Sequence, residues 1–498
     1  MRRRAFLQAA AGIAAARTPA SGIVDIGGTR QLFVDDMLLA ETSRVSKFQY
    51  RPDKHPKNPI LRPDRPWETG LGIQISGQSV LYDSDEKVFK MWYVATRGEN
   101  DGGRRWCYAV SHDGVAWEKP ELGLYEFQGS RRNNLISPDE WNGGGYFNVF
   151  KDPRDPDPGR RYKALGAGAA RGRDARGLIV AFSPDGLRWT EHPANPLTPM
   201  GREIADVPTM LGWDARLEKY VYYPRPGHPL TQEFNGNGKH RHVRTVGQSV
   251  SDDFIHWSPT QIMLAPDGED RVDYQYYQLT AAQQGEFYIG FLAVLQTHHQ
   301  TFDIYLLSSR DGFHWTWIER ELPFLGRGEP GSYDAGYLTP SGPIVHDGKI
   351  WIYYGAYSGA HSSDTSRFGP NRLSIALATL PAERYVGLLA GPDRATIATR
   401  PITFRGSRLM VELQASLADS KTPTGTGFDE CEVRAALLDQ SGGAIEGFTF
   451  ERSKRLIESG RQELTWEGAQ VGRLEGKPVR VRFELRNAAL CSIQFADA

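Results

Sequence analysis

The sequence is poor in features that would tie it to a metal ion, a lipid surface or a nucleic acid. Its three cysteines, Cys107, Cys431 and Cys491, match neither a metal-binding pattern nor a disulfide framework, and only Cys431 and Cys491 are candidates to pair. Charge is balanced, with 59 Lys and Arg against 60 Asp and Glu, so no nucleic-acid partner is expected. No metal ion or cofactor is expected either.

Long apolar runs and helical periodicity are also nearly absent after the first 20 residues, so no membrane span is expected. The first 20 residues differ from the rest. Arg3 and Arg4 precede Phe6 and Leu7, and an Ala-rich run follows. This order predicts a twin-arginine signal peptide over residues 1–20 and a periplasmic or secreted protein.

Glycine and aromatic residues, by contrast, are abundant, and one short motif recurs at intervals of roughly 60 to 70 residues. The motif reads Ser-x-Asp-Gly-x-x-Trp from Ser111, Ser183 and Ser309, and a variant without Gly begins at Ser251. Its Ser and Asp side chains bond nearby backbone N–H groups, Gly accepts a positive φ, and Trp begins a new strand. The motif therefore predicts hairpin turns with a structural role for four aspartates: Asp113, Asp185, Asp253 and Asp311.

Each copy belongs to a larger unit of an extended segment, a turn and an aromatic-rich strand. Five such segments occur, over residues 77–95, 146–166, 206–225, 277–295 and 336–357. Five blade-sized units predict an all-β chain with a five-bladed β-propeller over residues 21–390. Residues 31–36 are the expected donor of a closing strand, because an open ring would leave strand edges unpaired. Alternating strands after Gly391 predict a C-terminal β-sandwich over residues 391–498.

The segments Leu32–Asp36, Asn58–Leu61 and Trp67–Glu68, taken with the Asp-Gly-x-x-Trp repeats, resemble a group of secreted bacterial proteins related to glycoside hydrolase family 32. The wider superfamily contains the invertases, levansucrases and arabinanases of families 32, 43 and 68. The resemblance implies their architecture and a carbohydrate substrate. It does not extend to the catalytic motifs. No Asn-Asp-Pro-Asn occurs, Arg154–Pro156 follows an inner strand, and Glu430–Cys431 falls in the sandwich, so sucrose or fructan chemistry is not implied.

Acidic residues placed before the innermost strands converge on the central funnel of a propeller. Glycosidic cleavage needs a carboxylic acid and a second carboxylate, so we expect three catalytic residues: Asp206, Asp334 and Glu329. Glu203 and Glu68 are alternative acids. Arg225 fits either a clamp on a sugar hydroxyl or carboxylate or an ion pair between blades. The expected substrate-binding residues are Trp67, Glu68, Glu203, Arg225, Asp273 and His361.

Three functions are compatible with this pattern. Paired carboxylates and export favour a glycoside hydrolase acting on an oligo- or polysaccharide. A non-catalytic propeller that binds carbohydrate or protein would have an aromatic funnel in place of an acidic one. A polysaccharide lyase would need a neutralising cation and a Tyr or His base. Carboxylates roughly 5 to 10 Å apart would favour hydrolysis.

Overall fold

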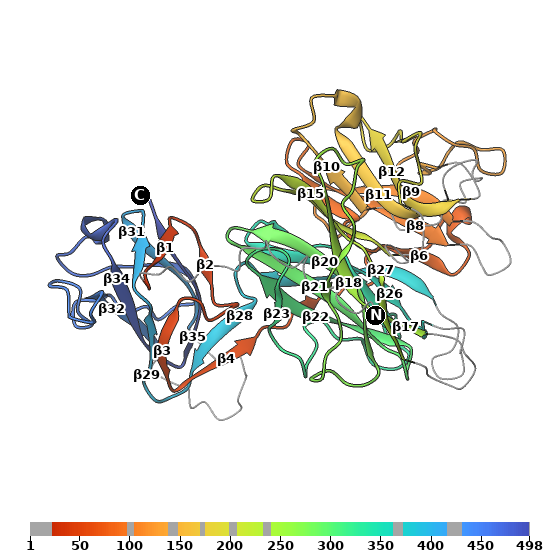
Figure 1. Cartoon of the computed structure of the whole chain (residues 1–498). Helices are drawn as coiled ribbons and strands as arrows, with labels where there is room; N and C mark the ends of the chain where they lie inside the picture. The colour runs from red at the N-terminus through yellow and green to blue at the C-terminus, as the bar shows by residue number, and fades with distance from the viewer. Residues whose placement is uncertain are drawn as a thin grey trace, which may run out of the picture. The chain divides into compact units, whose positions relative to one another are not determined.

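The computed structural model describes residues 22–96, 104–137, 148–169, 175–198, 207–232, 241–361, 372–415 and 431–497, with backbone alone described for 227–232 and 241–242. These residues form β-strands and three short 3-10 helices without an α-helix, which confirms the expected all-β class. None of these helices is long and apolar enough to cross a membrane. The residues divide into a small unit, 22–48 with 383–497, and a large unit, 49–382 (Figure 1).

The described part of the large unit contains five antiparallel meanders. Meander 1 begins with β6 (Gly72–Gln74) and β7 (Val80–Asp83), which together take the place of the first strand because both pair with β8. Its second strand is β8 (Val88–Thr96) and its third is β9 (Arg104–Ser111). Meander 2 has β10 (Asn148–Lys151), β11 (Tyr162–Ala169), β12 (Arg176–Ser183) and β13 (Thr190–Glu191). Meander 3 has β14 (Thr209–Asp214), β15 (Lys219–Tyr223), β18 (Val246–Ser251) and β19 (Gln261–Leu264), with β16 (Gly227–Gln232) and β17 (Arg241–Arg244) inserted.

Meander 4 has β20 (Tyr274–Gln284), β21 (Phe287–Gln296), β22 (Thr301–Ser309) and β23 (Trp315–Trp317). Meander 5 begins with β24 (Tyr337–Pro340) and β25 (Ile344–His346), which together take the place of the first strand because both pair with β26. It continues with β26 (Lys349–Tyr357), β27 (Leu373–Pro381) and β5 (Asp53–Lys54). Helix η1 (Pro66–Glu68) precedes β6 and helix η2 (Pro158–Arg160) lies between β10 and β11. The first two strands of each meander overlap the aromatic segments predicted from the sequence.

The second strand of a meander is covered on both faces, which explains why it lacks a simple alternation of polar and apolar residues. Every residue of β8 is buried. Met91 and Tyr93 share a core cluster with Tyr353 of meander 5, whereas Trp92 between them shares one with Tyr162 of meander 2. Because successive side chains of a strand point to opposite faces, meander 1 is packed between its two neighbours.

The repeated Ser-x-Asp motif forms the turn that follows the third strand of meanders 1 to 4, in agreement with the predicted hairpin turns. The carboxylate of Asp113 accepts the backbone N–H groups of Val115 at 2.8 Å and Ala116 at 2.7 Å. Asp185, Asp253 and Asp311 bond the equivalent amides of their own turns. In the variant without glycine, Phe254 takes a φ of 70° at the glycine position. The four aspartates are therefore structural.

The closing strand of meander 5 comes from the N-terminal side of the large unit, but not from the predicted residues. Lys54 and Asp53 of β5 pair with Ala378 and Thr379 of β27. The prediction that residues 31–36 donate this strand is wrong, because β2 (Gln31–Leu32) pairs with a strand of the small unit. A strand of only two residues carries no periodicity by which the sequence would reveal it.

Hydrogen bonds between first strands join the meanders in a closed cycle. Asn148 links meanders 1 to 2 and 2 to 3, because its side chain accepts the N–H of Gln78 at 2.7 Å and donates to the carbonyl of Pro208 at 2.8 Å. The Thr209 hydroxyl of meander 3 donates to the carbonyl of Leu279 in meander 4. The remaining links use backbone and hydroxyl groups of Thr280, Pro340, Thr339 and Ile75.

The small unit contains two sheets that share one hydrophobic core. The first sheet has β1 (Val24–Gly27), β30 (Ile402–Phe404), β34 (Val479–Arg486), β29 (Ala395–Thr399), β3 (Leu39–Ser43) and β32 (Glu432–Asp439). The second has β33 (Gly460–Leu464), β31 (Arg408–Gln414), β35 (Ala488–Ala496), β28 (Val386–Ala390), β4 (Val45–Gln49) and β2. Helix η3 (Val471–Leu474) completes it.

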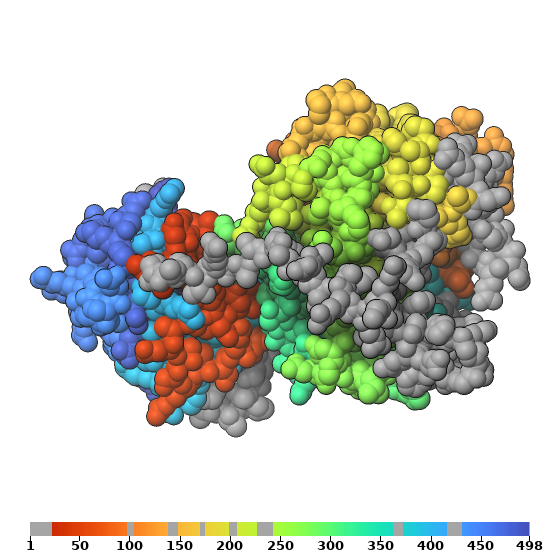
Figure 2. All heavy atoms as spheres, viewed as in Figure 1, coloured from red at the N-terminus to blue at the C-terminus, as the bar shows by residue number. Residues whose placement is uncertain are grey.

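Residues from the two ends of the chain build the small unit together. Figure 2 shows the red surface of the N-terminal strands lying against the blue and cyan surface of the C-terminal ones. The division therefore differs from the predicted one, in which residues 21–390 formed a single domain and 391–498 the other. No disulfide joins Cys431 and Cys491, and the Cys431 thiol donates to the carbonyl of Asn487.

Candidate functional site

The candidate residues of the sequence flank one end of the strands in the large unit, which we call the starting end because the first strand of each meander begins there. Glu203 and Asp206 lie outside the described residues, so their positions stay predictions. The other candidates precede β6, β20 and β24 or follow β15 and β26. Some of these candidates are bonded to other residues inside the protein, and others meet around one site.

Glu68 and Trp67 are engaged inside the protein. Glu68 is fully buried. One of its carboxylate oxygens accepts the Tyr93 hydroxyl at 2.6 Å and the other accepts Nζ of Lys119 at 2.7 Å. The Trp67 indole is 9% exposed and donates to Oδ1 of Asn134 at 2.9 Å. The pattern Trp67-Glu68 that suggested a sugar-binding pair thus holds helix η1 against meander 1.

Asp334 is similarly enclosed, whereas Glu329 is exposed. The Asp334 side chain is 2% exposed, and its Oδ2 lies 2.7 Å from Nζ of Lys54. The same oxygen accepts the Tyr354 hydroxyl at 3.2 Å, while Oδ1 accepts the Ser332 hydroxyl at 3.0 Å. These bonds attach the segment before β24 to the closing strand β5. They leave little carboxylate surface for a ligand.

Asp273 stands just before β20, at the start of meander 4. Its carbonyl accepts the N–H of Thr297, which fixes it beside the turn between β21 and β22. Oδ1 lies 3.3 Å from Nε of Arg271, and the side chain is 15% exposed. Oδ2 is buried and has no hydrogen-bond partner among the described residues. A buried acceptor of this kind has unused capacity for a donor.

Two predicted residues, Arg225 and His361, meet at the same tyrosine although 136 positions separate them in the sequence. The Arg225 guanidinium lies 4.2 Å from the ring centre of Tyr277, and Nε2 of His361 lies 3.0 Å from the hydroxyl of this tyrosine. The Arg244 guanidinium is 5.6 Å from the same ring centre. Nδ1 of His361 is 3.5 Å from Oε1 of Gln300. We call these five residues the Tyr277 cluster.

Aromatic rings from three strands support the cluster. The Tyr277 ring lies 4.4 Å from that of Phe302, which in turn lies 4.9 Å from Tyr337. Tyr337 stacks on Tyr357 at 3.8 Å. The Tyr357 hydroxyl donates to Oε1 of Gln74 at 2.6 Å and so reaches meander 1. Phe302, Tyr277 and Tyr357 are buried, which gives the polar groups above them a rigid base.

The His361 side chain is neutral at physiological pH. Burial, and to a smaller extent the positive charges of Arg244 and Arg225, together lower its pKa from 6.5 to about 4. A neutral imidazole has one donor and one acceptor nitrogen. It therefore bonds Tyr277 and Gln300 without adding to the positive charge of the cluster.

This arrangement is suited to binding. Guanidinium groups offer paired donors to hydroxyl, carboxylate or sulfate oxygens, and the phenol, imidazole and amide offer single donors and acceptors. The cluster itself contains no carboxylate, so a proton donor for glycosidic cleavage has to come from a neighbouring residue. Across the described ranges, no group of three or more His, Cys, Asp or Glu side chains is placed to hold a metal ion.

Sequence reasoning missed Tyr277 and Arg244. Tyr277 lies at a register shift between Tyr276 and Gln278, where the chain gains a residue and a side chain is redirected. The run Tyr274-Gln275-Tyr276-Tyr277 gives no sign of which tyrosine turns toward the site. Arg244 is the last residue of an inserted hairpin that falls outside the repeat, so no comparison between units would have identified it.

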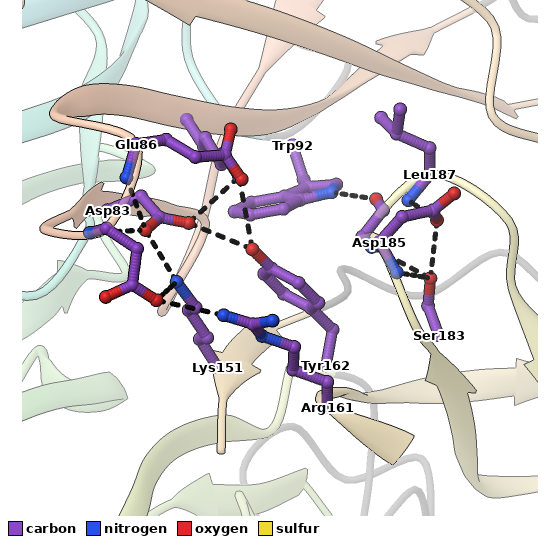
Figure 3. A network of polar contacts seen from close by, with 12 residues as sticks. Asp83, Glu86, Trp92, Lys151, Arg161, Tyr162, Ser183, Asp185 and Leu187 are labelled. Atoms are coloured by element: carbon purple, nitrogen blue, oxygen red, sulfur yellow. Dashed lines mark hydrogen bonds and ion pairs between the residues drawn. The ribbon is translucent and has the colours of Figure 1, made fainter. Parts of the chain in front are cut away.

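The opposite end of the strands holds a different kind of polar group, shown in Figure 3. Asp83 is buried, with Nζ of Lys90 at 2.9 Å, Nζ of Lys151 at 2.5 Å and the Tyr162 hydroxyl at 3.0 Å. Burial alone would raise the pKa of Asp83, but the hydrogen bonds from Lys151, Lys90 and Tyr162 hold it well below its usual range. Trp92 beside them donates to the carbonyl of Gly186.

The same contact recurs between the next meanders. Asp152 at the end of the first strand of meander 2 accepts the Tyr220 hydroxyl of meander 3 at 2.5 Å and pairs with Lys163 at 2.9 Å. Asp214 of meander 3 accepts the Tyr288 hydroxyl of meander 4 at 2.6 Å. Three equivalent aspartates thus bond tyrosines of the following meander. Their repetition gives them a structural role, although the pKa values of Asp83 and Asp152 are lowered and perturbed pKa values are common at active sites.

No protein-family model and no curated protein matches the sequence. Solved structures resemble its fold at low identity. An N-acetylgalactosamine deacetylase from F. plautii, in complex with blood group B trisaccharide, is 15% identical with a TM-score of 0.45, over 69% of this chain and 97% of its own. A glycosyl hydrolase from Bacteroides ovatus is 16% identical with a TM-score of 0.44, over 68% of this chain and 95% of its own.

A further solved structure, reported for a family 130 of mannoside phosphorylases containing glycoside hydrolases that target β-1,2 mannosidic linkages, is 15% identical. Its TM-score is 0.44, and the match covers 68% of this chain and 95% of its own. Likenesses with TM-scores below 0.5 carry no argument about the activity of this chain.

Proposed function

We propose that the large unit is a five-bladed β-propeller that processes carbohydrate as a glycoside hydrolase, in the periplasm or outside the cell, and that the small unit is an accessory β-sandwich. The cycle of hydrogen bonds through Asn148 and Thr209 supports the propeller. The observation that carries the function is the Tyr277 cluster. It joins side chains of meanders 3, 4 and 5 at the starting end, where the first strands of a propeller surround its central channel.

In this proposal the Tyr277 cluster binds the sugar and carboxylates from neighbouring segments perform the chemistry. Arg244, His361 and Gln300 are partly exposed, while Arg225 is 5% exposed and lies against the Tyr277 ring. Two planar guanidinium groups and an aromatic base suit the paired hydroxyls of a sugar ring.

For catalysis we assign Asp206 as the carboxylate that attacks the sugar or activates water, with Glu329 or Glu203 as the proton donor. Glu329 is exposed and carries no internal ion pair in the described part of the chain. Asp334 also opens a first strand, but its bonds to Lys54 and Tyr354 favour a positioning role for it. Asp273, with its unused buried oxygen, is a further residue able to contact a substrate hydroxyl.

A panel of plant and algal glycans tests the proposal, with product release followed by chromatography. Asp206→Asn is expected to lower kcat at least about 100-fold on any glycan that is cleaved, because it removes an interaction made in the transition state. Asp334→Asn is the comparison, with turnover expressed per folded molecule. Wild-type turnover in Asp206→Asn would disprove this assignment, and absence of cleavage across the panel would disprove hydrolysis.

The rival function is a non-catalytic carbohydrate-binding propeller. One observation favours it: Glu68 and Asp334, two of the acids expected at the funnel, are bonded inside the protein. Measured binding of a glycan that is never cleaved, with no loss of affinity in Asp206→Asn, would support this function over hydrolysis.

A further inference from the structure

Three residues of the Tyr277 cluster form a chain of hydrogen bonds that runs from Gln300 through His361 to Tyr277. The Gln300 amide nitrogen donates to the carbonyl of Thr297 at 2.8 Å, which fixes the orientation of the amide. Its oxygen, Oε1, then faces Nδ1 of His361 at 3.5 Å. Because an amide oxygen only accepts, the neutral imidazole carries its hydrogen on Nδ1.

The other imidazole nitrogen is therefore an acceptor, which sets the role of the tyrosine. Nε2 of His361 lies 3.0 Å from the Tyr277 hydroxyl, so the phenol donates its only hydrogen to the imidazole. The Tyr277 oxygen keeps its lone pairs, and no other polar group of the described residues bonds it. The chain holds this proton in place and does not transfer it, because a histidine whose pKa is lowered to about 4 is too weak a base to deprotonate a phenol.

The backbone of Gln300 has a conformation that is unusual for a residue with a side chain. Its φ is 56°, in the left-handed region that favours glycine. Its N–H donates to the carbonyl of Gln296 at 2.8 Å, and its carbonyl accepts the N–H of His361 at 2.8 Å. Residues held in such conformations cluster at ligand sites. A glutamine at this position therefore indicates a use for its amide side chain.

We propose that the Tyr277 oxygen accepts a hydrogen bond from a hydroxyl group of the carbohydrate, and that Gln300 and His361 are positioning residues that keep this oxygen an acceptor. The inference rests on the proposed function, namely that the starting end of the large unit binds carbohydrate. It adds a specificity, because a sugar with a deoxy position or an ether oxygen at this place would leave the acceptor unpaired. Tyr277 is 8% exposed, and Gln300 and His361 beside it are partly exposed.

The first measurement is the tautomer of His361 in the full-length protein, which requires no ligand. Protein with ¹⁵N-labelled histidine is examined by NMR at neutral pH, and His361→Gln identifies the signals of this residue. The hydrogen is expected on Nδ1 in the wild-type protein and is expected to move partly to Nε2 in Gln300→Gly. A wild-type imidazole that is charged or carries its hydrogen on Nε2, or a tautomer that is unchanged in Gln300→Gly, overturns the proposal.

The second measurement is binding to the full-length protein by isothermal titration calorimetry. The probes are three neutral trisaccharides: arabinotriose, galactotriose and laminaritriose. At least one is expected to bind, and Tyr277→Phe, which keeps the ring and removes the oxygen, is expected to weaken its binding about tenfold, or about 1.4 kcal/mol. Monodeoxy derivatives of that trisaccharide identify the contacted hydroxyl, since the derivative that lacks it is expected to bind wild type and Tyr277→Phe equally.

Glycine substitutions separate the side chain of Gln300 from its backbone. Gln300→Gly is expected to weaken binding of the same trisaccharide to a similar extent as Tyr277→Phe. Gln128 is the matched control, because it is also a glutamine with a positive φ, 50°, and its exposed side chain bonds no other described residue. Gln128→Gly is expected to leave both the affinity and the His361 tautomer unchanged.

The outcomes separate this proposal from the proposed function. Equal affinity of wild type and Tyr277→Phe, or a loss in Tyr277→Phe that persists with every monodeoxy derivative, overturns the assignment of the Tyr277 oxygen and leaves the carbohydrate function standing. A glycan of the panel takes the place of the trisaccharides if it alone binds. Failure of the trisaccharides and of every glycan of the panel to bind overturns both.

Discussion

At the scale of single residues, position relative to a strand was predictable and the identity of the partner was not. Arg225 and His361 were identified because each follows an aromatic strand, and the structure brings them to one ring. Glu68 occupies a similar position, yet its partner Lys119 stands 51 residues away and turns the glutamate inward. Local sequence does not encode such long-range pairing. It therefore does not distinguish an acidic residue that faces solvent at the start of a strand from one that faces the core.

His361 gives a prediction about pH. Its pKa falls from 6.5 in the unfolded chain to about 4 in the folded protein, so between these values the unfolded state binds the additional proton. The histidine therefore lowers stability as pH falls from 6.5 to 4, by up to about 3 kcal/mol. Urea unfolding at pH 7 and pH 4.5 measures this loss, which is expected to be smaller in His361→Gln by about that amount. An identical loss in both proteins would contradict the lowered pKa.

At the scale of elements, the repeated hairpins were predictable and the strand that completes them was not. Five aromatic segments indicated the first two strands of each meander because each combines strand-forming residues with a turn in between. The closing strand β5 has two residues, and its place is set by pairing with β27 and by the ion pair of Lys54 with Asp334. Residues 31–36 form a longer and more regular segment, so the sequence favoured them over β5 as the closing strand.

Lys54→Ala tests the importance of that closing contact. The substitution leaves the carboxylate of Asp334, which is 2% exposed, without its cation. We expect a loss of about 2 to 3 kcal/mol in the free energy of unfolding, at the low end of the range for breaking a buried pair because Lys54 is 29% exposed. Chemical denaturation provides the measurement.

Lys57→Ala, which removes an exposed lysine three residues away, is the control and is expected to change stability little. A loss of the same size in both variants would mean that the Lys54 contact has no special part in closing meander 5.

At the scale of the whole molecule, the number of units was predictable and their composition was not. A change of pattern near Gly391 indicated a second domain, but nothing in residues 22–48 shows that they belong with it. Leu32 and Phe33 fit a strand of either unit. The unit that they join depends on which unpaired strand edge and which apolar sheet face are available elsewhere in the chain, and these are properties of the folded molecule.

Phe33→Ala distinguishes the two assignments. Phe33 is 1% exposed in the core of the small unit, so its truncation is expected to cost about 3 to 5 kcal/mol there. Hydrogen exchange read by mass spectrometry is expected to accelerate in β30 and β34 and to stay unchanged in β21 and β26. Glu41→Ala, in an exposed position of β3, serves as the control. Faster exchange in the large unit alone would contradict the division found here.

The pairing of β1 with β30 has a consequence for the timing of biosynthesis. Asp25 and Thr403, which bond across this pair, are 378 residues apart. At ~5–20 residues per second, the ribosome needs about 20 to 75 s to deliver the second strand after the first. During that interval β1 and β5 have no native partner, because β5 also waits for β27. The large unit has all of its strands once β27 has been made, whereas the sheets of the small unit wait for β34 and β35, which are made more than about 90 residues later. The final steps of folding therefore come later in the small unit than in the large one.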